Sequence, residues 1–189
     1  MVNLTRIYTR TGDAGTTRLG DNSETNKNDP RLHAYADVDE LNSQIGLALA
    51  IGELDELVRE VLTRVQNELF DVGADLATPV VPDPQYPPLR VTADYVERLE
   101  VDCDSFNEGL TNLDSFILPG GTPAAALLHA ARTVARRAER SAWALVAAAT
   151  EHTNPLTATY LNRLSDLLFI LARVENPGGD VKWVPGGDR

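Results

Sequence analysis

Apolar residues recur at every third or fourth position through long stretches of this chain, which is the spacing of one face of an α-helix. The first such stretch begins at Asp37, and Glu40 follows three residues later, as in a helix-capping signal. A second stretch covers residues 53–76. A third window, residues 122–150, is rich in Ala and Leu and predicts one long helix.

Two further helices are indicated by their starting signals. Thr92 is a suitable N-cap for a helix that runs to about residue 108. Asn154 followed by Pro155 is a good cap and first-turn pair for a helix over residues 156–174. The chain is therefore predicted to contain five helices.

The segments between these helices carry residues that interrupt regular structure. Residues 79–88 hold five of the eleven prolines, which forbids a helix there, and residues 118–121 read Leu-Pro-Gly-Gly. Residues 1–31 are dense in Thr, Gly, Asp and Asn, and we expect a flexible loop with one short extended piece at residues 7–9. Residues 177–189 are expected to form a mobile tail.

No ladder of strands is predicted, so the fold class is all-α. An antiparallel five-helix bundle is the natural way to bury five apolar faces, and its sites are built from side chains on facing helices. With 189 residues, we expect a single domain over residues 1–189.

Composition and charge exclude several classes of function. The formal net charge of -11 argues against nucleic-acid binding, which needs a broad basic surface. No stretch approaches the roughly 20 apolar residues of a membrane span, and no secretory signal is visible. The single cysteine, Cys103, rules out an internal disulfide and suits the cytoplasm. The histidines are scattered without zinc-type spacing, so no protein metal cage is expected.

Against this acidic background, four arginines fall within nine residues of the long Ala-rich window: Arg132, Arg136, Arg137 and Arg140. Arg132, Arg136 and Arg140 are spaced by four residues, so in a helix their like charges repel one another. Either acidic neighbours or an anionic ligand must lie against them, and the pattern leaves both open.

A second candidate for anion binding is the run from Tyr8 to Thr17, with two glycines, four threonines and Arg10. Glycines let backbone N–H groups turn toward an anion, and hydroxyls add donors. On composition alone, a plain turn is the more common explanation. Lys27 is compatible with a phosphate ligand or with a surface lysine. The chain contains no Walker loop.

Other polar positions carry two interpretations each. Asp37 and Glu40 fit ordinary capping, whereas Asp39 is a partner for the arginines that either fixes geometry or serves a ligand. Asn162, on the last predicted helix, faces a polar site or solvent. Phe116 is by default a core aromatic.

Together, six segments resemble the PduO-type ATP:cob(I)alamin adenosyltransferases, also called corrinoid adenosyltransferases. The segments, which occur in the order of that family, are residues 7–15, 27–31, 38–43, 116–122, 132–140 and 161–166. Arg10 stands where the family often has lysine and keeps the charge. Nothing after Val174 has a firm match.

The resemblance implies a homotrimer of five-helix bundles with active sites between subunits, in which residues 1–31 become ordered around ATP. The implied reaction transfers the 5′-deoxyadenosyl group of ATP to cob(I)alamin and releases triphosphate. Cobalamin is then a substrate, supplied as cob(II)alamin and reduced to cob(I)alamin, and Mg²⁺ is held by the ATP phosphates. A reductase and an adenosylcobalamin-dependent enzyme are the expected partners.

The resemblance also implies roles for individual residues. Phe116 would fill the lower face of the corrin and displace its axial base, and Arg132 would pair with Asp39 at the interface. These three are the implied catalytic residues. The implied ATP-binding residues are Thr9, Arg10, Thr11, Gly12, Thr17 and Lys27 from one subunit, and Arg136, Arg137, Glu139, Arg140 and Asn162 from its neighbour.

Two other functions fit part of the sequence. A non-catalytic ATP-sensing or cofactor-carrying module would keep the phosphate loop without needing Phe116. A structural bundle with a salt-bridge network would explain the arginines but not the N-terminal run.

Overall fold

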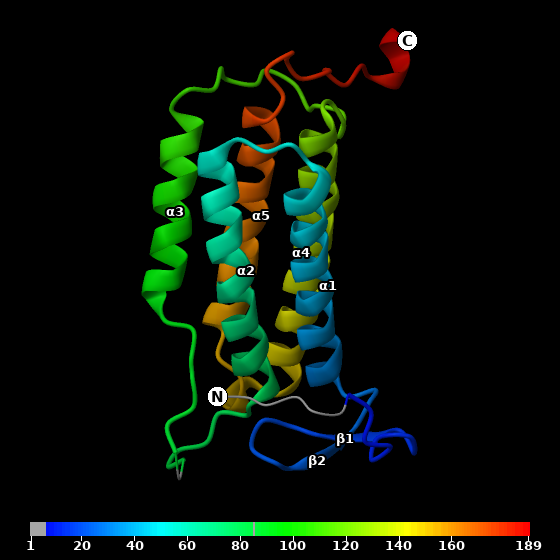
Figure 1. The fold of residues 1–189 in the computed structure, drawn as a ribbon, viewed down its shortest axis with the longest axis vertical. Coiled ribbons are helices and arrows are strands. Elements are labelled where there is room, and N and C mark those ends of the chain that lie inside the picture. The colour runs from blue at the N-terminus through cyan, green and yellow to red at the C-terminus, as the bar shows by residue number, and fades with distance from the viewer. Residues whose placement is uncertain (1–6, 85) are drawn as a thin grey trace.

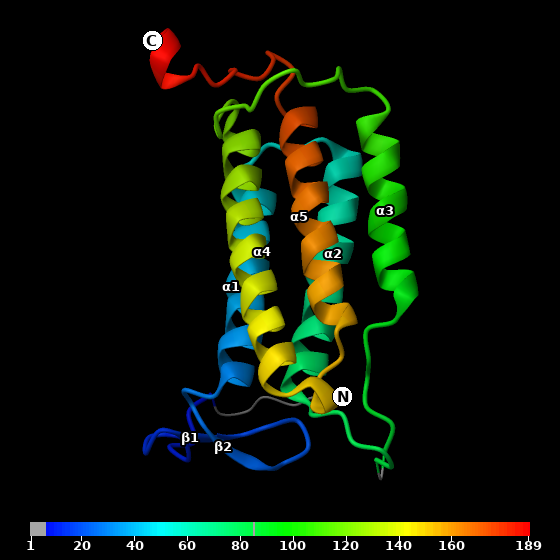
Figure 2. The same ribbon diagram turned by 180° about the vertical axis from the view of Figure 1, so that it is seen from behind.

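The computed structural model describes residues 7–84 and 86–189 and consists of five long helices that alternate in direction (Figures 1 and 2). The helices are α1 (Pro30–Ile51), α2 (Glu56–Ala77), α3 (Ala93–Asn107), α4 (Pro123–Ala148) and α5 (Leu156–Val174). Short 3₁₀ turns cover Thr150–His152 and Gly186–Asp188. The predicted all-α five-helix bundle is confirmed, and α5 has the predicted bounds. No helix in the described residues is long and apolar enough to cross a membrane.

The core forms where α1 packs against α2 and α4, and α5 packs against α4 and α3. On α4 the fully buried positions are mostly alanines, including Ala131, Ala135, Ala138 and Ala142. Their small side chains let neighbouring helix backbones approach closely. The buried alanines form one side of α4, and the arginines lie on the opposite side.

The first helix begins seven residues before the predicted start. Asp29 is its N-cap and accepts a 2.8 Å hydrogen bond from the Arg31 N–H, while Pro30 occupies the first turn. Asp37 is therefore not a cap. It lies inside α1, where its carboxylate accepts a hydrogen bond from the Ser141 hydroxyl of α4.

The N-terminal segment also differs from the expected loop. Residues 16–18 (β1, Thr16–Arg18) and 24–26 (β2, Glu24–Asn26) form an antiparallel hairpin, and the expected extended piece at residues 7–9 is not a strand. The first six residues of this segment lie outside the described part of the chain. The hairpin lies at one end of the bundle, which we call the base (Figure 1). Gly20 N–H donates to the Ala77 carbonyl at 2.9 Å and joins the hairpin to α2.

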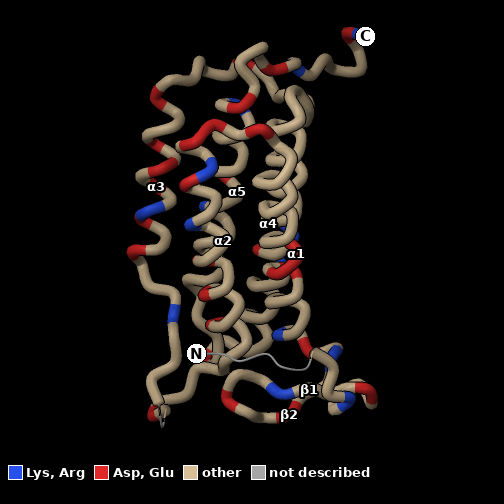
Figure 3. The backbone as a smooth tube through the Cα atoms, viewed as in Figure 1, with Lys and Arg blue, Asp and Glu red and all other residues tan. Residues whose placement is uncertain are grey.

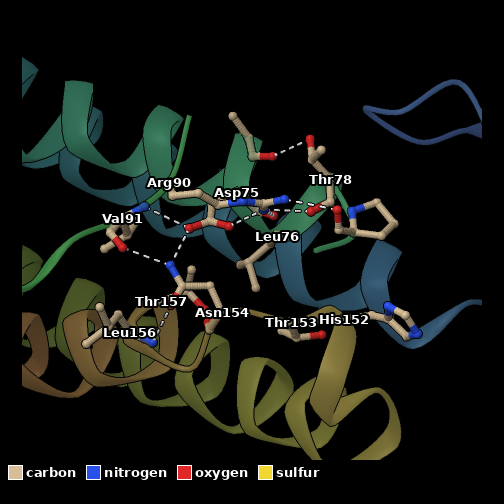
Figure 4. Close-up of polar contacts among 12 residues, drawn as sticks. Asp75, Leu76, Thr78, Arg90, Val91, His152, Thr153, Asn154, Leu156 and Thr157 are labelled. Atoms are coloured by element: carbon tan, nitrogen blue, oxygen red, sulfur yellow. Dashed lines mark hydrogen bonds and ion pairs between the residues drawn. The ribbon is translucent and has the colours of Figure 1, made fainter. Parts of the chain in front are cut away.

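The base is held together by the carboxylate of Asp75, near the end of α2 (Figure 4). This side chain is fully buried and forms an ion pair with Arg90. Its other oxygen accepts hydrogen bonds from Val91 N–H at 2.8 Å and from Asn154 Nδ2 at 2.7 Å. One carboxylate therefore links α2, the segment before α3 and the start of α5.

Arg31 completes the base from the side of α1. Its guanidinium donates to the carbonyls of Leu76 at 2.6 Å and His152 at 3.1 Å. Burial lowers the pKa of Arg31 from its usual value, an effect that the nearby Asp29 opposes. The helix that follows the hairpin is thus fixed to the ends of two other elements.

The C-terminal segment lies at the opposite end of the bundle (Figure 2). Ile117 and Lys182 form an antiparallel bridge, and Arg173 on α5 pairs with Asp180 at 2.8 Å. These contacts attach residues 180–183 to α5 and to the loop between α3 and α4. The expected mobility of residues 177–189 stays a prediction.

Replacing Asp75 by alanine should lower the free energy of unfolding by about 3–5 kcal/mol, because Arg90 would lose its buried partner and two further donors would be left unsatisfied. Chemical denaturation of the full chain measures this change. The matched control is Glu100→Ala, which removes an exposed ion-pair partner of Arg163 and should cost less than about 1 kcal/mol. Equal losses in the two variants would contradict the role assigned to Asp75.

Candidate functional site

The six N-terminal residues predicted to bind phosphates line a single cavity of about 680 Å³ beside the hairpin. They are Thr9, Arg10, Thr11, Gly12, Thr17 and Lys27. The structure therefore brings together every member of this predicted set. The same cavity is also lined by residues that the predicted set did not include, two of them acidic: Tyr8, Asp13, Thr16, Arg18 and Glu24. Basic and acidic residues both occur at this end of the molecule (Figure 3).

Close packing inside this cavity depends on a glycine. A Cβ atom at Gly12 would lie 3.0 Å from Lys27 Nζ and 3.2 Å from the Thr16 carbonyl oxygen. The ammonium group of Lys27 therefore rests directly over the Gly12 backbone, and Lys27 N–H donates to the Gly15 carbonyl at 2.9 Å. The Lys27 ammonium group and the backbone turn at residues 12–15 therefore lie side by side, an arrangement that suits an anion.

Arg10 has an unusual backbone conformation in this loop. Its φ is 64°, in the left-handed region that residues other than glycine seldom adopt. Its guanidinium lies 5.7 Å from the centre of the Tyr8 ring. Strained residues of this kind are concentrated at ligand-binding loops, which agrees with the predicted role of the segment.

The arginines of α4 line a second cavity, of about 380 Å³. Its walls are Arg132, Thr133, Arg136, Arg137, Glu139 and Arg140. The sequence left open whether acidic neighbours or an anionic ligand lie against these arginines. In the structure, the arginines differ in whether they have an acidic neighbour.

Arg137 has acidic neighbours within the chain. It forms an ion pair with Glu40 and lies 3.5 Å from Asp37, both on α1. The hydrogen bond with Glu40 is the main cause that raises the pKa of Arg137. The helix-capping interpretation of Glu40 is therefore wrong, since this side chain is an interhelical partner.

Among residues 7–84 and 86–189, no ion pair within the chain involves Arg132, Arg136 or Arg140. Arg136 and Arg140 are exposed, whereas Arg132 is half-buried. Burial, with a smaller effect from Arg136, lowers the pKa of Arg132. Three of the four cations on this face thus remain available to an external anion.

Asp39 does not pair with Arg132 within the subunit. It lines a different groove, of about 490 Å³, between α1 and α2, together with Tyr35 and the exposed ring of Phe70. Asp37 and Glu40 face α4, and Asp39 follows Asp37 by two residues, which is about half a helical turn. A pair between Asp39 and Arg132 would therefore have to join two subunits.

Asn162 is exposed on α5 and lines neither of the two basic cavities. Helical spacing places it on the same face as Phe169, which packs against Arg132. Because α4 and α5 are antiparallel, two turns from Phe169 toward the base brings Asn162 level with Arg136 and Glu139. Asn162 therefore lies beside the arginine face rather than within its cavity.

Phe116 is not a core aromatic, contrary to the default expectation. Its side chain is 79% exposed on the loop between α3 and α4. Its ring meets that of Trp183 edge-on, with centroids 6.2 Å apart. A large apolar side chain held at the surface by the neighbouring C-terminal segment is available to an external apolar surface.

The predicted site residues thus lie in separate places on one subunit. The hairpin cavity and the arginine cavity have no residue in common, and neither contains Asp39 or Phe116. Among the described residues there is also no group of three or more His, Cys, Asp or Glu side chains that could hold a metal ion.

Comparison with known proteins identifies what this arrangement resembles. A family model described as cobalamin adenosyltransferase matches residues 7–175. A corrinoid adenosyltransferase of Mycobacterium tuberculosis is 63% identical over 188 residues, covering 100% of this chain and 97% of the relative. A corrinoid adenosyltransferase of Bacillus subtilis is 44% identical over 185 residues, covering 94% and 92% respectively.

Solved structures with the same fold include variants of a PduO-type ATP:corrinoid adenosyltransferase from Lactobacillus reuteri. A phenylalanine-to-alanine variant complexed with cobalamin and ATP has a TM-score of 0.85 and 36% identity, covering 95% of this chain and 100% of that one. An arginine-to-lysine variant complexed with ATP has a TM-score of 0.82 at the same identity and coverage.

Replacing Gly12 by alanine should weaken binding of inorganic triphosphate about tenfold, since the added methyl group displaces the Lys27 ammonium from the loop. Titration calorimetry measures the affinity, and thermal denaturation checks that the fold persists. The control is Gly109→Ala, where an added Cβ meets nothing within 4 Å. Unchanged affinity in the Gly12 variant would mean that triphosphate binding does not depend on the position of Lys27 over the Gly12 backbone.

Proposed function

The chain belongs to the cobalamin adenosyltransferase family, and from this premise we propose that its hairpin and the arginine face of α4 from a neighbouring subunit form one ATP site. The protein is an ATP:corrinoid adenosyltransferase, which transfers the 5′-deoxyadenosyl group of ATP to cob(I)alamin. The observation that carries the assignment of the site is the set of three arginines without an acidic partner in the described chain.

The chemistry explains why unpaired cations are needed. The cobalt of cob(I)alamin supplies an electron pair to C5′ of ATP, so the cobalt–carbon bond forms as the C5′–O bond breaks. The oxygen keeps the bonding pair and leaves as triphosphate, whose negative charge grows during the step. Cations placed in advance stabilise this growing charge without rearranging. Because the nucleophile is already electron-rich, no general base is required.

Each half of the proposed site suits triphosphate in its own way. The hairpin offers Lys27, the Arg10 guanidinium and threonine hydroxyls around a tight backbone turn. On α4, Arg136 and Arg140 present guanidinium groups to solvent, and planar guanidinium matches phosphate oxygens in a bidentate manner. Glu139 and Asn162 would bind other polar groups of the nucleotide.

The role of Arg137 in this site is narrower than the family resemblance implies. Its ion pairs with Asp37 and Glu40 hold α1 against α4 in the free subunit. ATP would have to compete with Glu40 for this guanidinium. We propose that Arg136 and Arg140 bind triphosphate directly and that Arg137 supports them by fixing α4.

The separation of the two cavities supports a site shared between subunits. The proposed contact joins the α1–α2 groove of one copy, with Asp39 and Phe70, to the arginine face of α4 on the next. Two different faces of one chain then meet, and such an interface closes into a ring if the rotation permits. A homotrimer is the proposed assembly, in which Asp39 pairs with Arg132 across the interface.

Mg²⁺ fits this site only through the nucleotide. No cluster of metal-ligating side chains occurs in the described residues, whereas triphosphate oxygens are hard ligands that Mg²⁺ prefers. When bound, the ion neutralises part of the phosphate charge. The protein's own residues would position the phosphates around it.

Phe116 supports catalysis over a purely ATP-binding role. A module that only senses ATP or carries finished cofactor has no need of an exposed phenylalanine that lines neither the hairpin cavity nor the arginine cavity. We propose that Phe116 contacts the lower face of the corrin and favours reduction of cob(II)alamin. A cytoplasmic location, expected from the single cysteine, stays a prediction.

Replacing Arg136 by alanine should weaken ATP binding roughly 10–100-fold, because a charge-assisted contact to triphosphate is lost, while cobalamin binding changes little. Calorimetric titrations with ATP and with cobalamin separate the two effects. Arg163→Ala is the control, since this arginine faces α3 through its ion pair with Glu100 and should leave ATP binding unchanged. A similar loss of affinity for both substrates would indicate a folding defect instead.

Replacing Phe116 by alanine should leave ATP binding unchanged and abolish most turnover that starts from cob(II)alamin. Turnover from cob(I)alamin prepared in advance should suffer much less, because the difficult reduction is bypassed. Absorbance at the adenosylcobalamin bands and release of triphosphate follow the reaction. Leu118→Ala, in the same exposed loop, is the control. Near-native turnover from cob(II)alamin in the Phe116 variant would refute this role.

A further inference from the structure

Two polar atoms on α4 are buried without a hydrogen-bond partner in the described part of the chain: Nδ1 of His129 and Nε of Arg132. His129 is only 4% exposed, and Arg132 lies three residues further along the same helix. Unsatisfied buried polar atoms are rare in folded proteins, so two of them within one helical turn call for an explanation.

The two side chains lie over the same aromatic ring. The His129 ring meets Phe169 of α5 edge-on, with centroids 6.0 Å apart. The Arg132 guanidinium carbon lies 5.9 Å from the centre of the same ring. Residues three apart on a helix are neighbours on its surface, so the two unsatisfied atoms share one small region between α4 and α5.

The chemistry of the two atoms is complementary. Nε of arginine is always a donor, and Nδ1 of a neutral histidine is an acceptor when the proton resides on Nε2. We propose that His129 is a positioning residue for Arg132: its Nδ1 accepts the Arg132 Nε–H in the assembled site and directs the guanidinium toward Asp39 of the neighbouring subunit. This role rests on the proposed function, since it presupposes the inter-subunit pair.

The surroundings keep His129 neutral, as an acceptor must be. Burial is the main cause that lowers the pKa of His129, and the positive charge of Arg132 adds to it. Asp180, in the C-terminal segment, acts in the opposite direction. Protonation at acidic pH would remove the acceptor and place a second positive charge beside Arg132.

The proposal explains why Arg132 differs from the other arginines of its face. Arg136 and Arg140 are exposed and keep their rotational freedom, which suits a flexible triphosphate. Arg132 is half-buried on an aromatic ring and needs one fixed orientation to meet a carboxylate across an interface. A neutral neighbouring acceptor supplies that orientation without cancelling the charge.

Two substitutions of His129 test this role. Asparagine carries an oxygen near the position of Nδ1 and does not titrate, whereas phenylalanine keeps the ring and removes the acceptor. With ATP and cob(I)alamin, we expect His129→Asn to retain kcat/KM for cobalamin within about threefold at pH 7.5, and His129→Phe to lower it about tenfold. ATP affinity should be unchanged in both variants.

The pH profile distinguishes positioning from simple packing. Because burial lowers the pKa of His129 below the ordinary histidine value of about 6.5, kcat/KM for cobalamin in the wild type should hold at pH 6.5 and fall only at more acidic pH, where the ring becomes protonated. His129→Asn should lack this decline, and the ATP phosphates titrate equally in both proteins. Identical profiles, or full activity of His129→Phe in a stable fold, would overturn the proposal while leaving the proposed function intact.

An independent measurement does not depend on activity. Full-length protein labelled with ¹⁵N-histidine, with ATP and cyanocobalamin added, should show His129 as the neutral tautomer with the proton on Nε2. Its Nδ1 resonance should shift in Arg132→Lys, which lacks Nε–H. A proton on Nδ1, or no shift in that variant, would refute the hydrogen bond. If the wild type made no adenosylcobalamin, the proposed function would fail, and this measurement would still decide the contact.

Discussion

The buried carboxylate of Asp75 is the constraint on which the arrangement of this molecule depends. It joins the end of α2, the segment at Arg90 and the start of α5, which are far apart in the sequence. A buried charge without its partners is strongly destabilising, so this carboxylate favours the arrangement in which all three elements meet. Arg31 binds to the adjoining carbonyl of Leu76, and the hairpin precedes it directly. The proposed phosphate-binding loop is therefore positioned by the base of the bundle.

The distribution of charge explains how an acidic protein binds an anionic nucleotide. Acidic and basic residues both occur along the helices and at the hairpin (Figure 3), and two local groups of cations line the hairpin cavity and the arginine cavity. On that face, Arg137 is neutralised by Glu40, which fixes α4 to α1. Arg136 and Arg140 repel each other in the free subunit. In the proposed site, bound triphosphate neutralises this repulsion between the two guanidinium groups. Relief of the repulsion then contributes to the free energy of binding.

A single subunit presents the parts of the proposed site on different faces, and that separation has a physical benefit. If Asp39 could reach Arg132 within one chain, the pair would form without any partner and would contribute nothing to assembly. Because they lie on opposite sides of α1 and α4, each remains available to another copy. In the proposed assembly, His129 then matters as the acceptor that orients Arg132 toward the neighbouring subunit.

The sequence by itself determined the five helices and the family, because helical periodicity, caps and short motifs are local properties. It also singled out two groups of residues that line two cavities in the structure, and their binding of phosphate stays a prediction. It missed the hairpin, whose three-residue strands are too short to show alternation and depend on contacts such as Gly20 with Ala77. It also misjudged Glu40 and Phe116. Which arginine is neutralised, and which aromatic is exposed, depends on side chains that other helices bring near. Only the tertiary structure decided those partners, because electrostatic pairing and burial act through space rather than along the chain.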